Sequence, residues 1–124
     1  MTYIISEIGI NHNGDIELAK ELILKSKKSG CDAVKFQKRD IESVYTKEEL
    51  DTPRESPFGT TTREQKEGIE FSIEQYKELE KFSKEQGLEF IVSCWDTVSL
   101  DLVEEHLDVK YHKVASAMAT DRGF

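Results

Sequence analysis

Polar side chains capable of chemistry stand at or near the ends of four short, β-rich apolar runs. Lysines and hydroxyls are the groups that bind phosphate and carboxylate, and a nearby carboxylate can move a proton. Six residues share this setting: Glu7, Lys35, Gln37, Ser93, Lys113 and Ser116. If the runs are strands of one parallel sheet, these side chains gather at its carboxyl edge, where open α/β sheets and barrels carry their sites. The pattern therefore predicts a binding site for a small anion with an acid–base group beside it.

The alternation of side chains along a strand decides which of these residues face one another. In Ala33–Gln37, Lys35 and Gln37 point one way and Val34 and Phe36 the other. The apolar pair suits packing against helices, so Lys35 faces a barrel interior or a crevice, where an unpaired charge is costly. By the same parity Glu7 faces the side of its strand that carries Tyr3 and Gly9. The alternative is a Glu7–Lys35 ion pair that only satisfies two charges.

The elements that must position these residues alternate along the chain. Tyr3–Gly9, Ala33–Gln37, Glu89–Ser93 and Tyr111–Ala115 are predicted as strands. The predicted helices lie between them: one begins at the N-cap Asp15 and ends before Gly30, one begins at the capping box of Ser72 and Gln75 and stops at Gly87, and one covers Val98–Leu107. This order predicts a parallel sheet with right-handed crossovers. Periodicity leaves a doubly wound sheet and a barrel open, although no dinucleotide or P-loop motif is present.

The segment from Lys38 to about Phe71 is too long for an ordinary connection. It is polar and is punctuated by Pro53, Pro57 and Gly59. Such length favours a functional loop or lid. We expect the stretch Pro53–Pro57 to be an exposed loop.

Composition limits the partners. The 124 residues fit one domain, and the formal charge of −8 without a basic stripe argues against a nucleic-acid partner. There is no apolar run of membrane-spanning length and no secretory signal, so we expect no membrane contact and a cytoplasmic location. Cys31 and Cys94 fall at opposite edges of the predicted sheet, too far apart to bridge, and are expected to be reduced thiols.

The histidines do not form a metal motif. His12 lies in a turn, His112 on the outward face of a strand, and His106 late in a helix where it offsets the dipole. We therefore predict no metal ligand within this chain. Trp95 and Tyr111 are expected to be packing residues.

The run Glu7–Gly14 (EIGINHNG), followed by Val34–Gln37 (VKFQ), Phe90–Ser93 and Tyr111–Ser116, resembles the sialic acid synthase family over the whole chain. The resemblance implies that residues 1–124 are the first four βα units of a (β/α)8 TIM barrel, the N-terminal half of that domain. It also implies condensation of phosphoenolpyruvate with the open-chain aldehyde of an N-acetylated amino sugar, such as N-acetylmannosamine, to give a nonulosonic acid and phosphate.

By position, Glu7 resembles the family's catalytic carboxylate and Gln37 a sugar-contacting residue. Its phosphoenolpyruvate-binding set is similar to Lys35, Ser93, Lys113 and Ser116. The acidic residue often found two places after the last serine is Met118 here, so the sugar contact expected there is missing.

The resemblance further implies a divalent metal, Mn²⁺, whose histidine ligands lie in the second half of the barrel. It also implies a homodimer completed by a C-terminal antifreeze-like domain. Both parts are absent from this chain, so we expect it to be inactive alone. The motifs are common to N-acetylneuraminic, legionaminic and pseudaminic acid synthases. Two alternatives remain: a metal-free Schiff-base aldolase using Lys113 or Lys35, and a non-catalytic half barrel that associates through its sheet edges.

Overall fold

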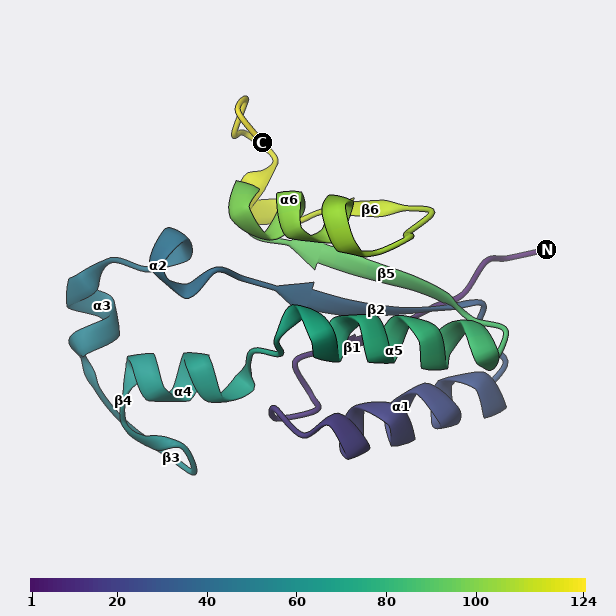
Figure 1. Cartoon of the computed structure of the whole chain (residues 1–124), viewed down its shortest axis with the longest axis horizontal. Coiled ribbons are helices and arrows are strands. Elements are labelled where there is room, and N and C mark those ends of the chain that lie inside the picture. Colours follow the sequence, from purple (N-terminus) through teal and green to yellow (C-terminus); the bar gives the residue numbers. More distant parts are fainter.

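A computed structural model describes all residues, 1–124, and is built around one four-stranded parallel sheet (Figure 1). Its strands are β1 (Ile5–Gly9), β2 (Ala33–Lys38), β5 (Glu89–Cys94) and β6 (His112–Val114), in the order β1-β2-β5-β6. Three helices connect them: α1 (Ile16–Lys28), α5 (Ile73–Glu85) and α6 (Thr97–His106). The four predicted strands and three predicted helices are thus confirmed, with ends that move by one to two residues.

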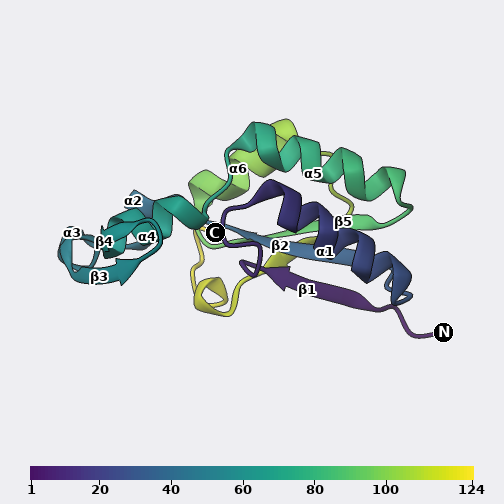
Figure 2. The same cartoon turned by 90° about the horizontal axis from the view of Figure 1, so that it is seen from below.

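The order of the strands decides between a doubly wound sheet and a barrel, the two folds that periodicity left open. Neighbours in the sheet follow one another along the chain, all pairs are parallel, and α1 packs on α5 and α5 on α6 in a single layer (Figure 2). A doubly wound sheet would reverse its order and carry helices on both faces. Sequential strands with helices on one face are the architecture of a (β/α)8 barrel, and the predicted fold class is confirmed.

The hydrophobic core lies between the sheet and this layer of helices. Val34 and Phe36 of β2, which were predicted to face the helices, are fully buried there. They join a cluster that includes Ile23, Leu79, Phe90 and Val92. The opposite face of the sheet has no helix over it, and Lys35 belongs to that face.

The helix ends follow the signals in the sequence. Asp15 accepts hydrogen bonds from the N–H groups of Glu17 and Leu18, and Ser72 and Gln75 form the reciprocal capping box. Gly30 and Gly87, just beyond α1 and α5, have φ of +83° and +75°, which residues with a Cβ rarely adopt.

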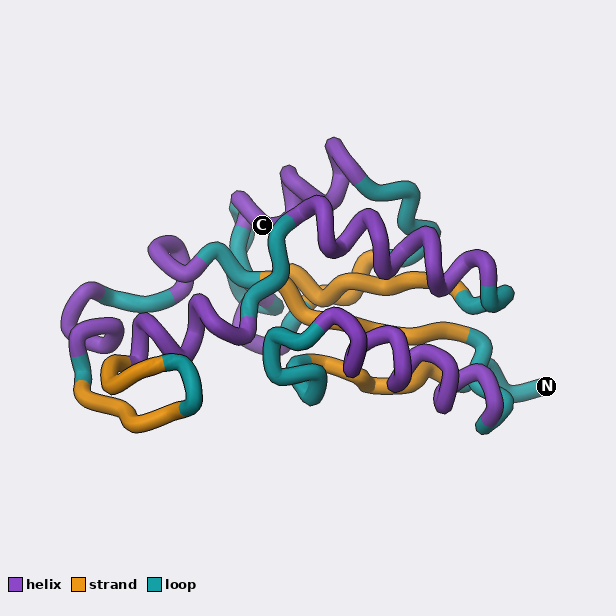
Figure 3. The backbone as a smooth tube through the Cα atoms, turned by 60° about the horizontal axis from the view of Figure 1, so that its bottom comes forward, coloured by secondary structure: helices purple, strands orange, loops and turns teal.

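The long segment after β2 was predicted to be a functional loop or lid, and the expectation of a loop is corrected because the segment has regular secondary structure. It folds into a lobe of five short elements that projects from one end of the sheet (Figure 3). They are α2 (Ile41–Val44), α3 (Lys47–Asp51), the antiparallel hairpin β3 (Pro53–Ser56) and β4 (Gly59–Thr61), and α4 (Thr62–Ile69). Two capping boxes, Thr46 with Glu49 and Thr61 with Glu64, start α3 and α4. The expected exposed loop at Pro53–Pro57 is therefore mostly a strand, although its residues are largely exposed.

The lobe is joined to the turn after β1 by close backbone packing. A Cβ atom at Gly14 would lie 1.9 Å from the carbonyl oxygen of Gly68 in α4, and Gly14 also has a φ of +75°. Position 14 therefore accepts no side chain. Next to this contact the imidazole of His12 stacks on the rings of Phe71 and Phe36, with centroids 4.1 and 5.8 Å away. The turn, the lobe and β2 form one packed unit.

Two further expectations concern the whole chain. Cys31 and Cys94 are both free, as predicted. None of the helices is long and apolar enough to cross a bilayer.

Candidate functional site

The first pair of predicted site residues is in direct contact. Glu7 and Lys35 are register partners on β1 and β2, and their side chains form an ion pair on the uncovered face of the sheet. The exposed fraction of the Lys35 side chain is 10%, whereas that of Glu7 is 65%. The ion pair between neighbouring strands is therefore present, and both the catalytic and the purely structural interpretation of it predict this contact. The carboxylate remains accessible from the open side.

A second row of polar residues lies one step nearer the carboxyl ends of the strands. Gln37 is the register partner of Ser93, and Ser93 is the register partner of Lys113. Because register partners share a face, this row and the Glu7–Lys35 pair lie on the same side of the sheet. Ser93 is buried, with 6% of its surface exposed, while Lys113 is exposed.

Gln37 is close to the end of β1. A Cβ atom at Gly9 would lie 3.4 Å from the Gln37 side-chain nitrogen Nε2, so the amide lies over the backbone of Gly9. Gly9 also has a φ of +57°. Glycine at this position both permits the turn and leaves room for the amide.

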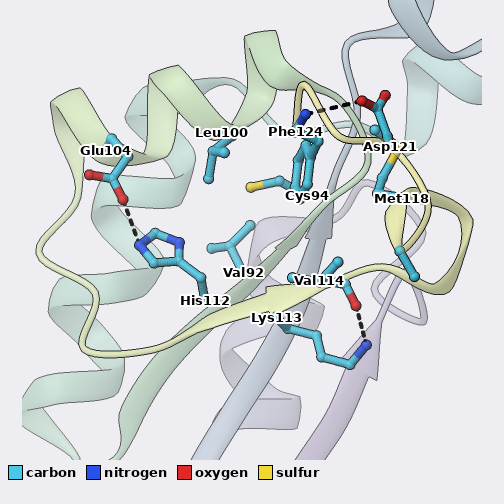
Figure 4. Close-up of a pocket in the computed structure, with 11 residues that line it drawn as sticks. Val92, Cys94, Leu100, Glu104, His112, Lys113, Val114, Met118, Asp121 and Phe124 are labelled. Carbon is cyan, nitrogen blue, oxygen red and sulfur yellow. Dashed lines mark hydrogen bonds and ion pairs between the residues drawn. The ribbon is translucent and has the colours of Figure 1, made fainter.

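The end of β6 separates its side chains between the two faces. His112 Nε2 is 2.6 Å from Glu104 Oε1 of α6, so His112 is on the outward face as predicted, and Lys113 extends from the other side of the strand (Figure 4). The Lys113 ammonium donates to the carbonyl oxygen of Val114 at 2.5 Å. Ser116 follows, exposed, at the start of the 3₁₀ helix Ser116–Met118.

The uncovered face holds a hollow of about 560 Å³. Its walls are apolar apart from two lysines and one histidine: Tyr3, Ile5, Ile91, Tyr111, Lys35, Lys113 and His112. Lys35 pairs with Glu7 beside this hollow, and Lys113 has no acidic partner among the residues that line it. Cations in an apolar hollow, next to hydroxyl and amide groups, suit a small ligand that carries more than one negative charge.

A second hollow, of about 410 Å³, lies on the opposite side, between β6, α6 and the C-terminal segment (Figure 4). Its lining is mainly apolar and includes Val92, Leu100 and Met118. Its polar groups already have partners within the chain, such as Glu104 with His112 and Asp121 with the backbone N–H of Phe124. The candidate site is therefore the uncovered face.

A group of charged side chains packed beneath the end of β2 was not predicted from the sequence. Lys38, expected to begin the loop, is the last residue of β2, buried, with its ammonium 5.1 Å from the ring centroid of Tyr76. Glu70 accepts a hydrogen bond from the backbone N–H of Arg39 at 3.2 Å, and burial raises the pKa of its carboxyl to about 7. The charged run directly after a buried strand was the available signal.

Asp96 links the exits of β2 and β5. It is buried, and its carboxylate accepts from the backbone N–H groups of Asp40 at 2.8 Å and Ser99 at 2.6 Å. The neighbouring Trp95 packs beneath Arg39, whose guanidinium carbon is 3.9 Å from a ring centroid. Tyr111 lies edge-on to Tyr3, with ring centroids 6.2 Å apart. Trp95 thus takes a packing position, as expected, whereas Tyr111 is 43% exposed and lines the hollow on the uncovered face.

The structure contains no group of three or more histidine, cysteine or acidic side chains placed to hold a metal ion. His12 is buried, its Nδ1 accepts from the N–H of Gly14 at 3.0 Å, and burial lowers its pKa to about 4. Burial raises the pKa of the Cys94 thiol to about 12, so it does not supply a thiolate. The residues of this chain do not fit a metal site.

The sheet order places the chain in the class of (β/α)8 barrel folds, and its polar carboxyl edge lies where such barrels carry their sites. The family follows from comparison: a NeuB family profile matches residues 22–124, and the chain belongs to the NeuB family. The predicted resemblance is confirmed.

Curated relatives agree over most of the chain. It is 40% identical to mouse N-acetylneuraminate-9-phosphate synthase over 116 residues, 92% of this chain and 32% of the relative. It is 36% identical to N,N'-diacetyllegionaminic acid synthase of Legionella pneumophila over 122 residues, 96% of this chain and 34% of the relative. The chain spans about a third of the length of these relatives.

Solved structures support the fold. A putative spore coat polysaccharide biosynthesis protein E from Chromobacterium violaceum matches with a TM-score of 0.79 and 25% identity, over 98% of this chain and 36% of that one. The N-acetylneuraminic acid synthetase of Leptospira borgpetersenii matches with a TM-score of 0.71 and 24% identity, over 94% and 36%.

Proposed function

We propose that this NeuB-family chain supplies part of the active site of an enzyme that condenses phosphoenolpyruvate with an N-acetylated amino-sugar aldehyde. The products are a nonulosonic acid and inorganic phosphate. The observation that carries the proposal is the pairing of Glu7 with Lys35 on the uncovered face, one row from Gln37, Ser93 and Lys113. Family membership and the names of the curated relatives support it.

The reaction balances as follows. C3 of phosphoenolpyruvate forms a bond to the aldehyde carbon, and the aldehyde oxygen takes a proton to become a hydroxyl. Water adds at C2 and loses one proton, which leaves a hydroxyl on C2. As the bond from C2 to the phosphate oxygen breaks, this hydroxyl becomes the keto group, and its proton leaves with the phosphate as hydrogen phosphate. One proton is gained and one is lost, so a single carboxylate that accepts and returns a proton serves both steps.

The residues of the site suit these demands. Lys35 and Lys113 provide cations for the phosphate and carboxylate of phosphoenolpyruvate, and the hydroxyls of Ser93 and Ser116 add donors. The Glu7 carboxylate, which is 65% exposed on the open side of the sheet, is placed for proton transfer to substrate or water. The amide of Gln37, next to Gly9, is placed to hydrogen bond the sugar.

The metal belongs outside these residues. In this proposal, Mn²⁺ is held by ligands beyond the chain, and the complete enzyme is a cytoplasmic homodimer. Such a divalent ion would supply a positive charge able to polarise an aldehyde oxygen. A Schiff-base aldolase using Lys113 or Lys35 would need an uncharged lysine amine. Lys35 is ion-paired with Glu7, so Lys113 is the lysine that the borohydride experiment below must test.

The test is an assay of the native gene product with phosphoenolpyruvate and a panel of sugars, following phosphate release and the keto acid formed. Since the condensation adds three carbons, N-acetylmannosamine 6-phosphate would give a 9-phosphate product, and unphosphorylated N-acetylmannosamine and a diacetamido sugar complete the panel. Phosphate release that occurs only when one of these sugars is present supports the proposal. Borohydride trapping of a lysine adduct, without use of phosphoenolpyruvate, contradicts it.

A further inference from the structure

The backbone carbonyl of Gln37 lies where the sheet stops providing hydrogen-bond partners. The Lys38 carbonyl accepts from the N–H of Trp95 at 3.1 Å and therefore points toward β5. Successive carbonyls of a strand point to opposite sides, so that of Gln37 points toward β1. The last residue of β1 in register is Gly9, opposite Phe36, and the chain then turns away. β1 has no further residue to pair with Gln37.

A side chain from the helical layer takes the place of that partner. The hydroxyl of Tyr76, on α5, donates to the Gln37 carbonyl oxygen at 2.5 Å. Tyr76 is 1% exposed, and burial raises the pKa of its hydroxyl well above the ordinary value, so it remains a donor at any physiological pH. Its ring is held by an edge contact with Phe71 and by the ammonium of Lys38.

We propose that Tyr76 is a positioning residue of the site, which fixes the end of β2 so that the Gln37 side chain is presented beside Gly9. The contribution of Gln37 to sugar binding rests on the function proposed above, whereas the Tyr76–Gln37 contact does not. Lys35, two residues earlier, is held in register by Glu7 on one side and Ile91 on the other. Loss of the tyrosine hydroxyl should therefore disturb Gln37 and spare Lys35.

The direct test is Tyr76→Phe, which keeps the ring contacts and removes only the donor. Tyr45→Phe is the matched control, because Tyr45 lies in the lobe beneath Lys66 and its hydroxyl bonds no protein atom. In glutamine-labelled protein, the Gln37 side-chain amide resonances, identified by their loss in Gln37→Ala, should shift in Tyr76→Phe and stay unchanged in Tyr45→Phe. Unchanged Gln37 resonances in a folded Tyr76→Phe variant would overturn the proposal.

Kinetics of the native gene product separate positioning from a purely structural role. Losing one neutral hydrogen bond to the strand should raise the KM for the amino sugar roughly 2- to 10-fold, with the KM for phosphoenolpyruvate unchanged. Equal rises in both constants, or none, contradict positioning. If Gln37→Ala itself leaves sugar binding intact while the resonances shift as expected, the Tyr76–Gln37 contact stands and the proposed function of Gln37 fails.

Discussion

Glu7 and Lys35 form an ion pair whose two ends are in different surroundings. The exposed fraction is 65% for the carboxylate side chain and 10% for the lysine, although the two are direct neighbours in the sheet. An exposed carboxylate can exchange a proton with substrate or water. A buried ammonium that loses its partner is costly. The catalytic and structural roles of the pair therefore predict different results for one substitution.

In the native gene product, Glu7→Gln should slow turnover while preserving shape and binding. Loss of a general acid–base group lowers kcat about 10²- to 10⁴-fold, with little change in the Michaelis constants. Steady-state kinetics and thermal unfolding of the same sample provide the measurement, with Glu17→Gln on α1 as the exposed, ion-paired control. Near-normal kcat with a large fall in Tm would show that the pair is only structural.

Lys35→Met and Lys113→Met should each weaken phosphoenolpyruvate binding more than sugar binding. Each removes one cation from an anionic ligand, and one charge-assisted contact is worth about 1.5–3 kcal/mol. Separate KM values for the two substrates measure the difference. Lys110→Met, beside Tyr111 and outside the hollow, is the control. Equal effects on both substrates would contradict the assigned role.

Glu70 should make the chain less stable as pH rises toward neutrality. Burial raises its pKa from 4.5 to about 7, so the folded chain holds this proton more tightly than the unfolded chain does. Glu70 therefore contributes up to about 3 kcal/mol to the free energy of unfolding. This contribution is fully present below pH 4.5 and is lost as pH rises through 7.

Urea unfolding of wild type and Glu70→Gln between pH 5 and pH 8 tests this. The wild type should lose its stability advantage over the variant as pH rises, because the glutamine oxygen still accepts from the Arg39 N–H but does not titrate. His12, whose lowered pKa acts with the opposite sign, contributes equally to both proteins and cancels in the difference. The exposed Glu55→Gln is the control, and a difference independent of pH would refute the assignment.

The isolated 124-residue chain should self-associate and lack synthase activity. β1 and β6 each have one unpaired edge, and the face that carries Ile5, Ile91 and Tyr111 has no covering layer. Sedimentation velocity across a range of concentrations measures the association. A monodisperse, active monomer would contradict both parts of the prediction.

The sequence predicted the elements that have a regular period and missed those that are short. Apolar alternation identified the strands and placed Lys35 opposite Val34 and Phe36, because parity is a property of the strand itself. The order of the strands in space is set by packing between elements, so it was read only from the structure. The lobe was missed because its elements are three to eight residues long and polar, although the T-x-x-E signals at Thr46 and Thr61 mark two helix starts.

Within the candidate site, the sequence predicted which polar residues share the uncovered face of the sheet. It did not predict the contacts from the helical layer that hold those residues in place. Glu7, Lys35, Gln37, Ser93 and Lys113 lie on one face because each has the same parity in its strand. The contact from Tyr76 joins residues 39 positions apart. No local pattern records such a contact, since Tyr76 fits the apolar stripe of α5 equally well without it.

The burial of His12 divides the EIGINHNG motif into one part that faces the candidate site and one part that packs against the rest of the fold. Glu7 and Gly9 face the uncovered side, whereas His12 and Gly14 are sealed against Phe71 and the lobe. The two parts are therefore free to be lost independently in evolution. A relative that keeps the histidine and second glycine but has replaced the glutamate should retain the architecture and lack the chemistry, which is the pattern of a pseudoenzyme.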